Sequence, residues 1–234
     1  MIVEKVLISV YVIIPAFNEN LSISKVITDI PKDIVTETIV VNNGSTDGTG
    51  DIAKNHGATV LLENRKGYGF SCLKGMDYLS SKAEPDDIIV FIDGDYSDFP
   101  EEISMLINPI LHSGYQMVIG SRVLGERQSG SLLPQQIAGN WLATKLIGLF
   151  FNAKFTDLGP FRAIKWDALK GINMQDKTFG WTVEMQIKAA KNKLKFTEIP
   201  VSYRKRIGES KVSGTMRGTF MAGYKILLTI FKYL

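Results

Sequence analysis

The sequence predicts an α/β fold, a mixed and mostly parallel sheet with helices on both faces. Apolar stretches of strand length alternate with helical stretches through the first half of the 234-residue chain. These apolar stretches lack polar alternation, which is typical of strands that are covered on both sides. Polar residues follow three of them, at Asn18, Asn42 and Asp93. Ligands of such sheets bind at that edge, beyond the carboxyl ends of the strands.

The individual elements follow from hydrophobic spacing and from end signals. Apolar runs predict strands at residues 6–14, 38–41, 60–62, 88–92 and 117–119. Helical spacing predicts helices at residues 20–30, 47–56, 73–79 and 100–111. In the second half, a stretch containing Gly, Ser, Gln and Pro predicts a loop over residues 125–139. We expect helices at 141–151 and 181–191, a strand or turn at 155–164 and a last strand at 196–203.

Composition limits the class of protein. Hydrophobic residues make up 45% of the chain, which is enough for one domain with a core. The net charge of +3 suits an anionic small molecule or a membrane surface and is too small to indicate a nucleic-acid partner. Cys72 is the only cysteine, which excludes an intrachain disulfide and a cysteine-rich zinc site.

Two further observations bear on location. Glu4 and Lys5 interrupt the apolar N-terminus, which favours a strand over a signal peptide. No uncharged apolar stretch is long enough to span a bilayer. We therefore expect a cytoplasmic protein that is soluble or peripheral on the cytoplasmic face of a membrane.

The clearest chemical signal is Asp93-Gly94-Asp95, directly after the apolar residues 88–92. In an extended segment residues i and i+2 point the same way, so both carboxylates share a face. Carboxylate oxygens suit Mg²⁺ or Mn²⁺, which keeps waters and takes further ligands from substrate phosphates. The alternative is an exposed acidic turn before the next helix. Asp98 is expected to cap that helix rather than to bind metal.

Two short motifs have other interpretations. A strand that ends in Asp-x-Asp-x-Ser resembles the haloacid-dehalogenase phosphatases, but their motif usually ends the first strand and has Thr or Val where Ser97 stands. The stretch KGYGF, residues 66–70, resembles a dinucleotide-binding loop, but Cys72 stands in place of the third glycine. We interpret this stretch as a loop and helix start beside the substrate.

Three motifs taken in order carry a broader resemblance. They are IIPAFNE (13–19), VVNNGSTDGT (40–49) and IVFIDGD (89–95). Together they resemble the family 2 glycosyltransferases of the GT-A fold. The likeness continues through VIGSR (118–122), GNWLATKLIG (139–148), TDLGPFRAI (156–164) and EIPVSYRKRIGESKVSG (198–214). It covers nearly the whole chain and looks most like the polyprenyl-phosphate sugar transferases, the dolichol-phosphate mannose synthase group.

The resemblance implies a metal-dependent transferase that takes a sugar from a UDP- or GDP-sugar by single displacement with inversion. The GT-A domain would span residues 1–212, with a nucleotide-binding half at 1–120, an acceptor-side half at 121–212 and an amphipathic helix at 213–234. Asp93 and Asp95 would bind Mg²⁺ or Mn²⁺. Asp95, Asp157 and Glu184 would be catalytic, the last two as base or sugar-binding carboxylates. The nucleotide would be held by Pro15, Ala16, Asn18, Glu19, Asn42, Ser45 and Asp93. Phosphate and acceptor groups would meet Arg122 and a loop containing Arg206, Ser210 and Lys211.

Two acceptor classes remain open. The oxyanion of a polyprenyl phosphate is already nucleophilic, whereas a hydroxyl acceptor needs a base such as Asp157 or Glu184. Lipid-phosphate members of the family carry further basic residues where this chain reads PQQIAGN, with Gln135, Gln136 and Ile137, and only Arg127 is nearby. Relatives also usually have Asp where Asn42 stands, so an inactive nucleotide-sugar or lipid binding protein is a third interpretation.

The C-terminal stretch predicts an amphipathic helix. Its apolar stripe consists of Met216, Phe220, Tyr224, Leu227, Phe231 and Leu234, and Arg217, Lys225 and Lys232 gather to one side of it. Such a helix packs on its own domain or on a second subunit of a homodimer, or it rests on anionic lipid. The sequence leaves these alternatives open.

Overall fold

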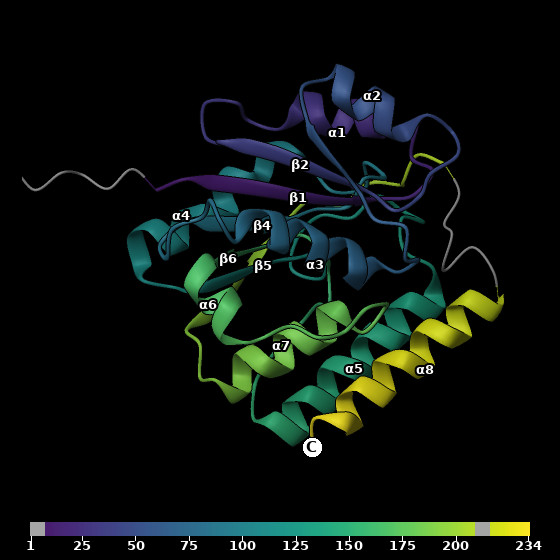
Figure 1. Cartoon of the computed structure of the whole chain (residues 1–234). Helices are drawn as coiled ribbons and strands as arrows, with labels where there is room; N and C mark the ends of the chain where they lie inside the picture. Colours follow the sequence, from purple (N-terminus) through teal and green to yellow (C-terminus); the bar gives the residue numbers. More distant parts are fainter. Residues whose placement is uncertain (1–7, 209–215) are drawn as a thin grey trace, which may run out of the picture.

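The computed structural model describes residues 8–208 and 216–234, with the side chains of residues 216–220 left out. Seven strands form one sheet in the order β3-β2-β1-β4-β6-β5-β7 (Figure 1). The strands are β1 (Val10–Ala16), β2 (Glu37–Asn42), β3 (Thr59–Leu62), β4 (Ile88–Phe91), β5 (Met117–Ser121), β6 (Arg162–Lys165) and β7 (Phe196–Pro200).

The sheet is mixed, as the sequence predicts. Strands β1 to β4 pair in parallel, and β5 pairs in parallel with β7. Strand β6 lies between β4 and β5 and runs antiparallel to both. The carboxyl ends of β1, β2 and β4 therefore meet at one edge of the sheet, where the amino end of β6 also lies.

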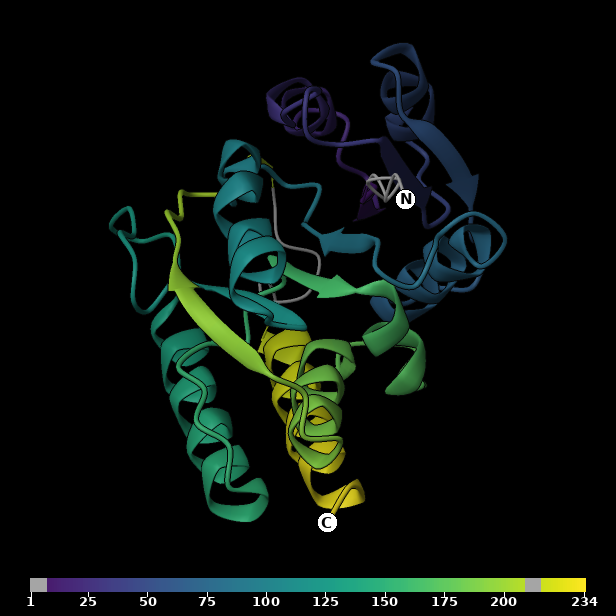
Figure 2. The same ribbon diagram turned by 90° about the vertical axis from the view of Figure 1, so that its left-hand side faces the viewer.

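Helices cover both faces of this sheet. They are α1 (Ile23–Asp29), α2 (Thr49–Asn55), α3 (Tyr68–Leu79), α4 (Ile103–Ser113), α5 (Pro134–Phe151), α6 (Trp166–Gly171), α7 (Trp181–Lys191) and α8 (Met216–Lys232), with a 3₁₀ turn at Pro100–Glu102. Side chains of α1, α2 and α4 pack on one face of the sheet. Side chains of α3, α5, α6, α7 and α8 pack on the other, where α5, α7 and α8 form one group (Figures 1 and 2).

Some elements differ from the prediction. The expected loop over 125–139 is wrong in its second half, because α5 already begins at Pro134. Proline suits the first position of a helix, and the Gln136 side chain accepts a hydrogen bond from the backbone N–H of Leu133. Helix α6 was not predicted, and the first part of the expected strand at 6–14 lies outside the described residues.

Strand β4 is buried on both faces and fixes the position of the acidic motif. Its four residues are at most 1% exposed, and the Phe91 ring meets the Trp181 ring edge-on with centroids 6.0 Å apart. Such packing leaves the end of the strand little freedom to move. Among the helices within the described part of the chain, none combines the length and the hydropathy that crossing a bilayer requires.

Candidate active site

A pocket of about 510 Å³ opens at the carboxyl ends of β1, β2 and β4. It is lined by Pro15, Ala16, Phe17, Glu19, Asn43, Lys66, Gly67, Tyr68, Ser71, Asp93, Gly94, Asp95, Phe179 and Arg206. Five of the side chains that the sequence assigned to nucleotide or metal line it: Pro15, Ala16, Glu19, Asp93 and Asp95. Residues from β1, β4, the start of α3 and two later segments thus meet in one cavity.

The acidic motif faces this pocket together with a cation from far along the chain. Asp95 is 6% exposed, and its Oδ1 accepts hydrogen bonds from the backbone N–H and the hydroxyl of Ser97. Its Oδ2 lies 3.2 Å from Nη1 of Arg206, whose Nη2 donates to Oε1 of Glu19 at 3.0 Å. One guanidinium therefore joins two carboxylates from the segments that follow β4 and β1.

Charge crowding perturbs two carboxyl groups here. Burial, and then the charge of Asp95, raise the pKa of Asp93 to about 7. Burial also raises the pKa of Glu19 to about 7, with Arg206 opposing the shift and Asp95 adding to it. Carboxyl groups perturbed in this way in a cleft are typical of functional sites.

The acidic pair fits a divalent cation that is shared with a substrate. Oδ1 of Asp93 is buried and has no hydrogen-bond partner among the described residues, so it is a ligand atom without a protein partner. Within the described ranges, no cluster of three or more His, Cys, Asp or Glu side chains is arranged to hold a metal. Mg²⁺ and Mn²⁺ commonly use one or two carboxylates and complete their shell with water and phosphate oxygens. Two carboxylates in the lining of a pocket satisfy that requirement.

The loops after β1 and β2 interlock, and this places three predicted nucleotide-binding residues differently from expectation. The backbone N–H of Asn18 donates to the Ser45 hydroxyl, and Oδ1 of Asn18 accepts from the N–H of Thr46. Oδ1 of Asn42 accepts from the N–H of Ser45. Asn18, Asn42 and Ser45 are not among the residues that line the pocket. They hold the two loops together.

Asn43, the next residue along, lines the pocket and was missed by the sequence argument. Its Oδ1 accepts from the N–H of Gly67, and its amide nitrogen donates to the carbonyls of Glu63 and Arg65. Asn43 thereby fixes the segment just before α3, of which Lys66 and Gly67 line the pocket. Lys66 also lines the pocket. Its Nζ donates to the carbonyl of Asn43 and lies 3.9 Å from the centroid of the Phe17 ring.

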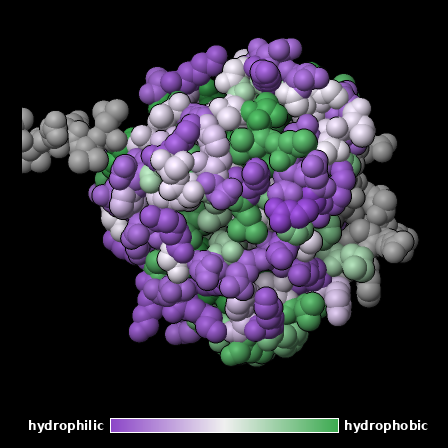
Figure 3. All heavy atoms as spheres, viewed as in Figure 1, coloured by the Kyte–Doolittle hydropathy of each residue, from purple (hydrophilic) through white to green (hydrophobic). Residues whose placement is uncertain are grey.

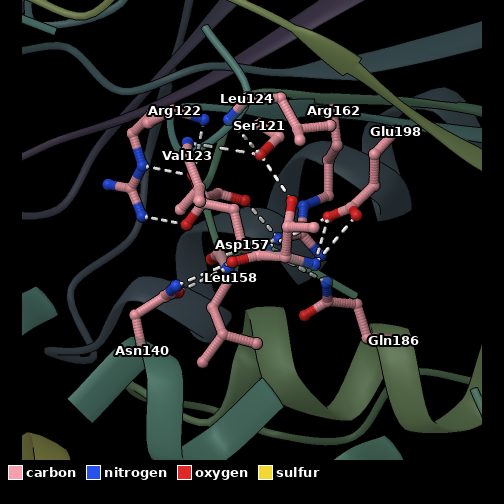
Figure 4. Close-up of polar contacts among 12 residues, drawn as sticks. Ser121, Arg122, Val123, Leu124, Asn140, Asp157, Leu158, Arg162, Gln186 and Glu198 are labelled. Atoms are coloured by element: carbon pink, nitrogen blue, oxygen red, sulfur yellow. Dashed lines mark hydrogen bonds and ion pairs between the residues drawn. The ribbon is translucent and has the colours of Figure 1, made fainter. Parts of the chain in front are cut away.

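Arg122 and Asp157 form a buried ion pair beside β5 and β6 (Figure 4). Nε and Nη2 of Arg122 each donate to the carboxylate of Asp157 at 2.7 Å, and the N–H of Arg122 donates to Oδ2. Burial acts to raise the pKa of Asp157, but the charge and hydrogen bonds of Arg122 hold it below its usual range. Glu198 fixes the same loop by accepting from the N–H groups of Thr156 and Asp157.

Glu184 is 0% exposed and lies outside the pocket lining. Its carboxylate accepts from the N–H groups of Gln175 and Asp176, pairs with Lys188 at 2.8 Å and accepts from the Tyr233 hydroxyl. The geometry thus favours structural roles for Asp157 and Glu184, and the base role expected for either one remains a prediction. Two further predicted residues, Ser210 and Lys211, lie outside the described residues.

Asp98 is not the helix cap that the sequence predicts. Phe99 occupies the capping position before the 3₁₀ turn, and no side chain caps it. Asp98 is 1% exposed, and neither of its carboxylate oxygens has a hydrogen-bond partner among the described residues. Burial, together with the charges of Asp93 and Asp95, raises its pKa well above the usual range.

The raised pKa values of Asp93 and Glu19 predict how stability depends on pH. Each group holds a proton up to about pH 7 when folded, its raised pKa, but loses it near pH 3.8 (Asp93) or pH 4.5 (Glu19) when unfolded. Between these values the folded state binds more protons, so the free energy of unfolding falls as pH rises. We expect metal-free protein to lose on the order of 2 kcal/mol between roughly pH 5 and pH 8. Urea unfolding in chelator measures this, and Asp93→Asn should lose less. A free energy that is flat or rises with pH contradicts the assignment.

The buried ion pair predicts a second outcome. In Asp157→Asn the guanidinium of Arg122 keeps its buried position without a counter-charge, so we expect the free energy of unfolding to fall by about 3–5 kcal/mol. The double variant Asp157→Asn/Arg122→Met should recover part of that loss. Asp86→Asn is the matched control, because Asp86 pairs with Lys165 while 65% exposed and should cost under about 1 kcal/mol. Equal losses for the two single variants in urea unfolding would show that the pair does not stabilise this loop.

Comparison with known proteins adds independent information. Residues 11–171 match the model of the family described as "Glycosyl transferase family 2". An uncharacterized glycosyltransferase of Mycobacterium tuberculosis is 31% identical over 218 residues, which are 92% of this chain and 94% of the relative. The undecaprenyl-phosphate mannosyltransferase of Micrococcus luteus is 28% identical, with 89% of each chain covered.

A solved structure supports the fold. Glucosyl-3-phosphoglycerate synthase from Mycobacterium tuberculosis, in complex with Mn²⁺, UDP-glucose and phosphoglyceric acid, superposes with a TM-score of 0.75 at 22% identity. The match covers 96% of this chain and 79% of that one. The sheet described above is thus the GT-A sheet, and the family match spans most of the strands that build the pocket. The chain belongs to glycosyl transferase family 2 and is a glycosyltransferase.

Proposed function

We propose that the protein transfers a sugar from a UDP- or GDP-sugar to a polyprenyl phosphate, with Mg²⁺ or Mn²⁺ and with inversion at the anomeric carbon. The observation that carries the proposal is the pocket that Asp93 and Asp95 line. The relatives support it, because one of them is named for transfer to undecaprenyl phosphate and the superposed synthase binds Mn²⁺ with UDP-glucose.

The described residues suggest how the donor would be held. Pro15, Ala16 and Phe17 line the pocket together with the residues from Lys66 to Tyr68, and the nucleoside would bind against this lining. Asp93 and Asp95 would hold the metal, which supplies positive charge to the leaving diphosphate. Arg206 is the cation that this chain itself offers to the diphosphate, because its guanidinium already reaches the acidic pair. We also propose that residues 1–120 form the nucleotide-binding half and residues 121–212 the acceptor-side half, with Arg206 of the second half reaching into the donor pocket.

The engagement of the expected bases supports a phosphate acceptor over a hydroxyl acceptor. Asp157 is paired with Arg122 and Glu184 is enclosed by four donors, so neither carboxylate is free to take a proton from a substrate hydroxyl. A phosphate oxyanion needs no such base. Arg127 lines a second pocket of about 340 Å³ together with Gln128 and Ser129, and it is the basic group nearest in sequence to Arg122 on this side.

The donor and the metal are tested together. We expect UDP or GDP to raise the melting temperature in the presence of Mn²⁺ and much less in chelator, because a ligand that binds only the folded state stabilises it. In Asp95→Asn the part of the rise in melting temperature that requires Mn²⁺ should disappear. The kcat/KM for transfer from the matching sugar donor to a polyprenyl phosphate should fall by roughly a hundredfold or more. Asp51→Asn, an exposed change on α2, is the control.

Each outcome of this test separates the alternatives. Transfer to hydroxyl compounds and not to polyprenyl phosphate would contradict the proposed acceptor. Metal-dependent nucleotide binding with neither transfer nor hydrolysis of any sugar donor would identify a binding protein without activity.

Because a polyprenyl phosphate lies in a membrane, we also propose that the protein has a face that binds a membrane. Helices α5 and α8 lie side by side and expose apolar side chains, with the Phe150 and Phe231 rings 6.0 Å apart (Figures 1 and 3). These exposed side chains are Ile137, Trp141, Leu142, Leu149, Tyr224, Leu228 and Phe231. Residues 133–154 and 216–234 contain no Asp or Glu and five Lys or Arg, of which Lys225 pairs with Asp176 and does not belong to this face. An apolar face with only positive charge suits the surface of an anionic membrane.

Vesicle binding tests this face. We expect the protein to sediment with vesicles that contain phosphatidylglycerol and less with pure phosphatidylcholine. Trp141→Ser/Leu149→Ser should weaken that binding roughly tenfold, because two exposed apolar groups are lost. Leu21→Ser changes a side chain that is 65% exposed on another part of the surface and should have no effect. If light scattering shows a dimer that the double variant breaks, the face is a contact between subunits and the membrane proposal fails.

A further inference from the structure

We propose that α8 positions the donor pocket from outside it, by holding the loop of residues 173–180 against residues 66–71. The inference rests on the proposed function only in naming the pocket a donor site. Among the described residues, those that line the pocket include none from α8. The connection runs through a chain of hydrogen bonds, ion pairs and close backbone contacts, which begins at the pocket wall.

The 173–180 loop and the 66–71 segment form one packed unit at the pocket. Phe179 of the loop lines the pocket, as do Lys66, Gly67, Tyr68 and Ser71 of the segment. The N–H of Phe70 donates to the carbonyl of Lys177 at 3.1 Å. A Cβ atom on Gly67 or on Gly69 would overlap the backbone carbonyls of Lys177 and Asp176. A displacement of the loop therefore displaces the pocket wall.

Two carboxylates hold the backbone of the loop, Glu184 from α7 and Asp176 from the loop itself. Glu184 accepts from the N–H groups of Gln175 and Asp176, at 3.0 and 2.6 Å. Oδ1 of Asp176 accepts from the N–H groups of Thr178 and Gly180, at 2.7 and 3.1 Å. The two side chains are 0% and 8% exposed, respectively. Buried carboxylates keep such geometry only while their charge is compensated.

Lys188 of α7 compensates the charge of Glu184, and α8 with the residue that follows it supplies a further cation and a hydrogen-bond donor. Nζ of Lys225 lies 3.0 Å from Oδ2 of Asp176, and the Tyr233 hydroxyl donates to Oε1 of Glu184 at 2.5 Å. Between them, Thr229 faces Gly180 so closely that a Cβ there would lie 2.5 Å from its hydroxyl oxygen. Lys225 and Thr229 are four apart and share one side of α8, and Tyr233 follows directly after the helix ends at Lys232.

The side of α8 that carries Lys225 and Thr229 is distinct from its outward side. Tyr224, Leu228 and Phe231 are 46–55% exposed, whereas Thr229 is 3% exposed. Helix α8 contacts both α5 and α7 and lies between them in Figure 2, and α7 begins directly after the loop. Lys225 and Tyr233 are therefore positioning residues: they touch no pocket atom, and they fix the loop that does.

The test uses the full chain with Lys225→Met/Tyr233→Phe. The matched control is Lys145→Met/Tyr224→Phe, which makes the same chemical changes on exposed side chains of α5 and α8. Hydrogen exchange is measured without ligand, and the Kd for UDP and for GDP is measured with Mn²⁺ by calorimetry. We expect faster exchange in residues 66–71 and 173–180 with unchanged exchange in β4. Nucleotide binding should weaken by roughly three- to tenfold, and the control should match the unaltered protein. Lys225→Arg keeps the ion pair and should retain binding.

The outcomes are distinct. Unchanged exchange in both segments overturns the inference, and so does exchange that rises equally in β1 and β4, because that is general destabilisation. If the unaltered protein binds neither UDP nor GDP, the proposed donor is wrong, while the exchange measurement still decides whether α8 holds the loop. Faster exchange in both segments with unchanged nucleotide affinity overturns the link to the pocket.

Discussion

The charge of two carboxylates at the end of β4 is the constraint on which the site depends. Strand β4 is buried on both faces, so Asp93 and Asp95 cannot relieve their repulsion by moving apart. Asp93 relieves the repulsion by keeping a proton up to about pH 7, its raised pKa, and Arg206 adds positive charge, bridging Asp95 to Glu19 from the segment that follows β7. A cation bound to the diphosphate of a sugar donor would neutralise the same negative charge. The fold therefore creates a local negative field, and both chain and substrate have the means to neutralise it.

Much of the fold follows from short-range patterns in the sequence and could be predicted from them. The strands β1 to β5 are continuous apolar runs, and their order of appearance with intervening helices is the usual sign of a parallel sheet. The direction of β6 was not available from its four residues, because strand direction depends on which neighbours it pairs with. The start of α5 was missed because Gln, Gly and Pro suggested a loop, although Pro134 was itself a usable start signal.

The sequence predicted which strand end carries the acidic pair, but it did not predict the roles of the residues around that strand end. The sequence placed Asp93 and Asp95 at the rim, because that follows from the buried strand before them. It could not choose between Asn42 and Asn43, since neighbouring residues in a turn point in different directions that only the turn geometry decides. It also could not distinguish a catalytic carboxylate from a structural one. That distinction lies in distant partners: Arg122 for Asp157, and Tyr233 for Glu184.

Because β6 is inserted between β4 and β5, the seven strands cannot be separated into two modules. Without the residues after 120, Ile88–Phe91 would become a bare sheet edge of four apolar residues, and such edges pair with other chains. A fragment carrying only the first half would thus aggregate before it could act as a nucleotide-binding unit. Recombination can exchange this sheet between proteins only as a whole, which leaves the loops at its rim as the part of the chain that is free to diversify.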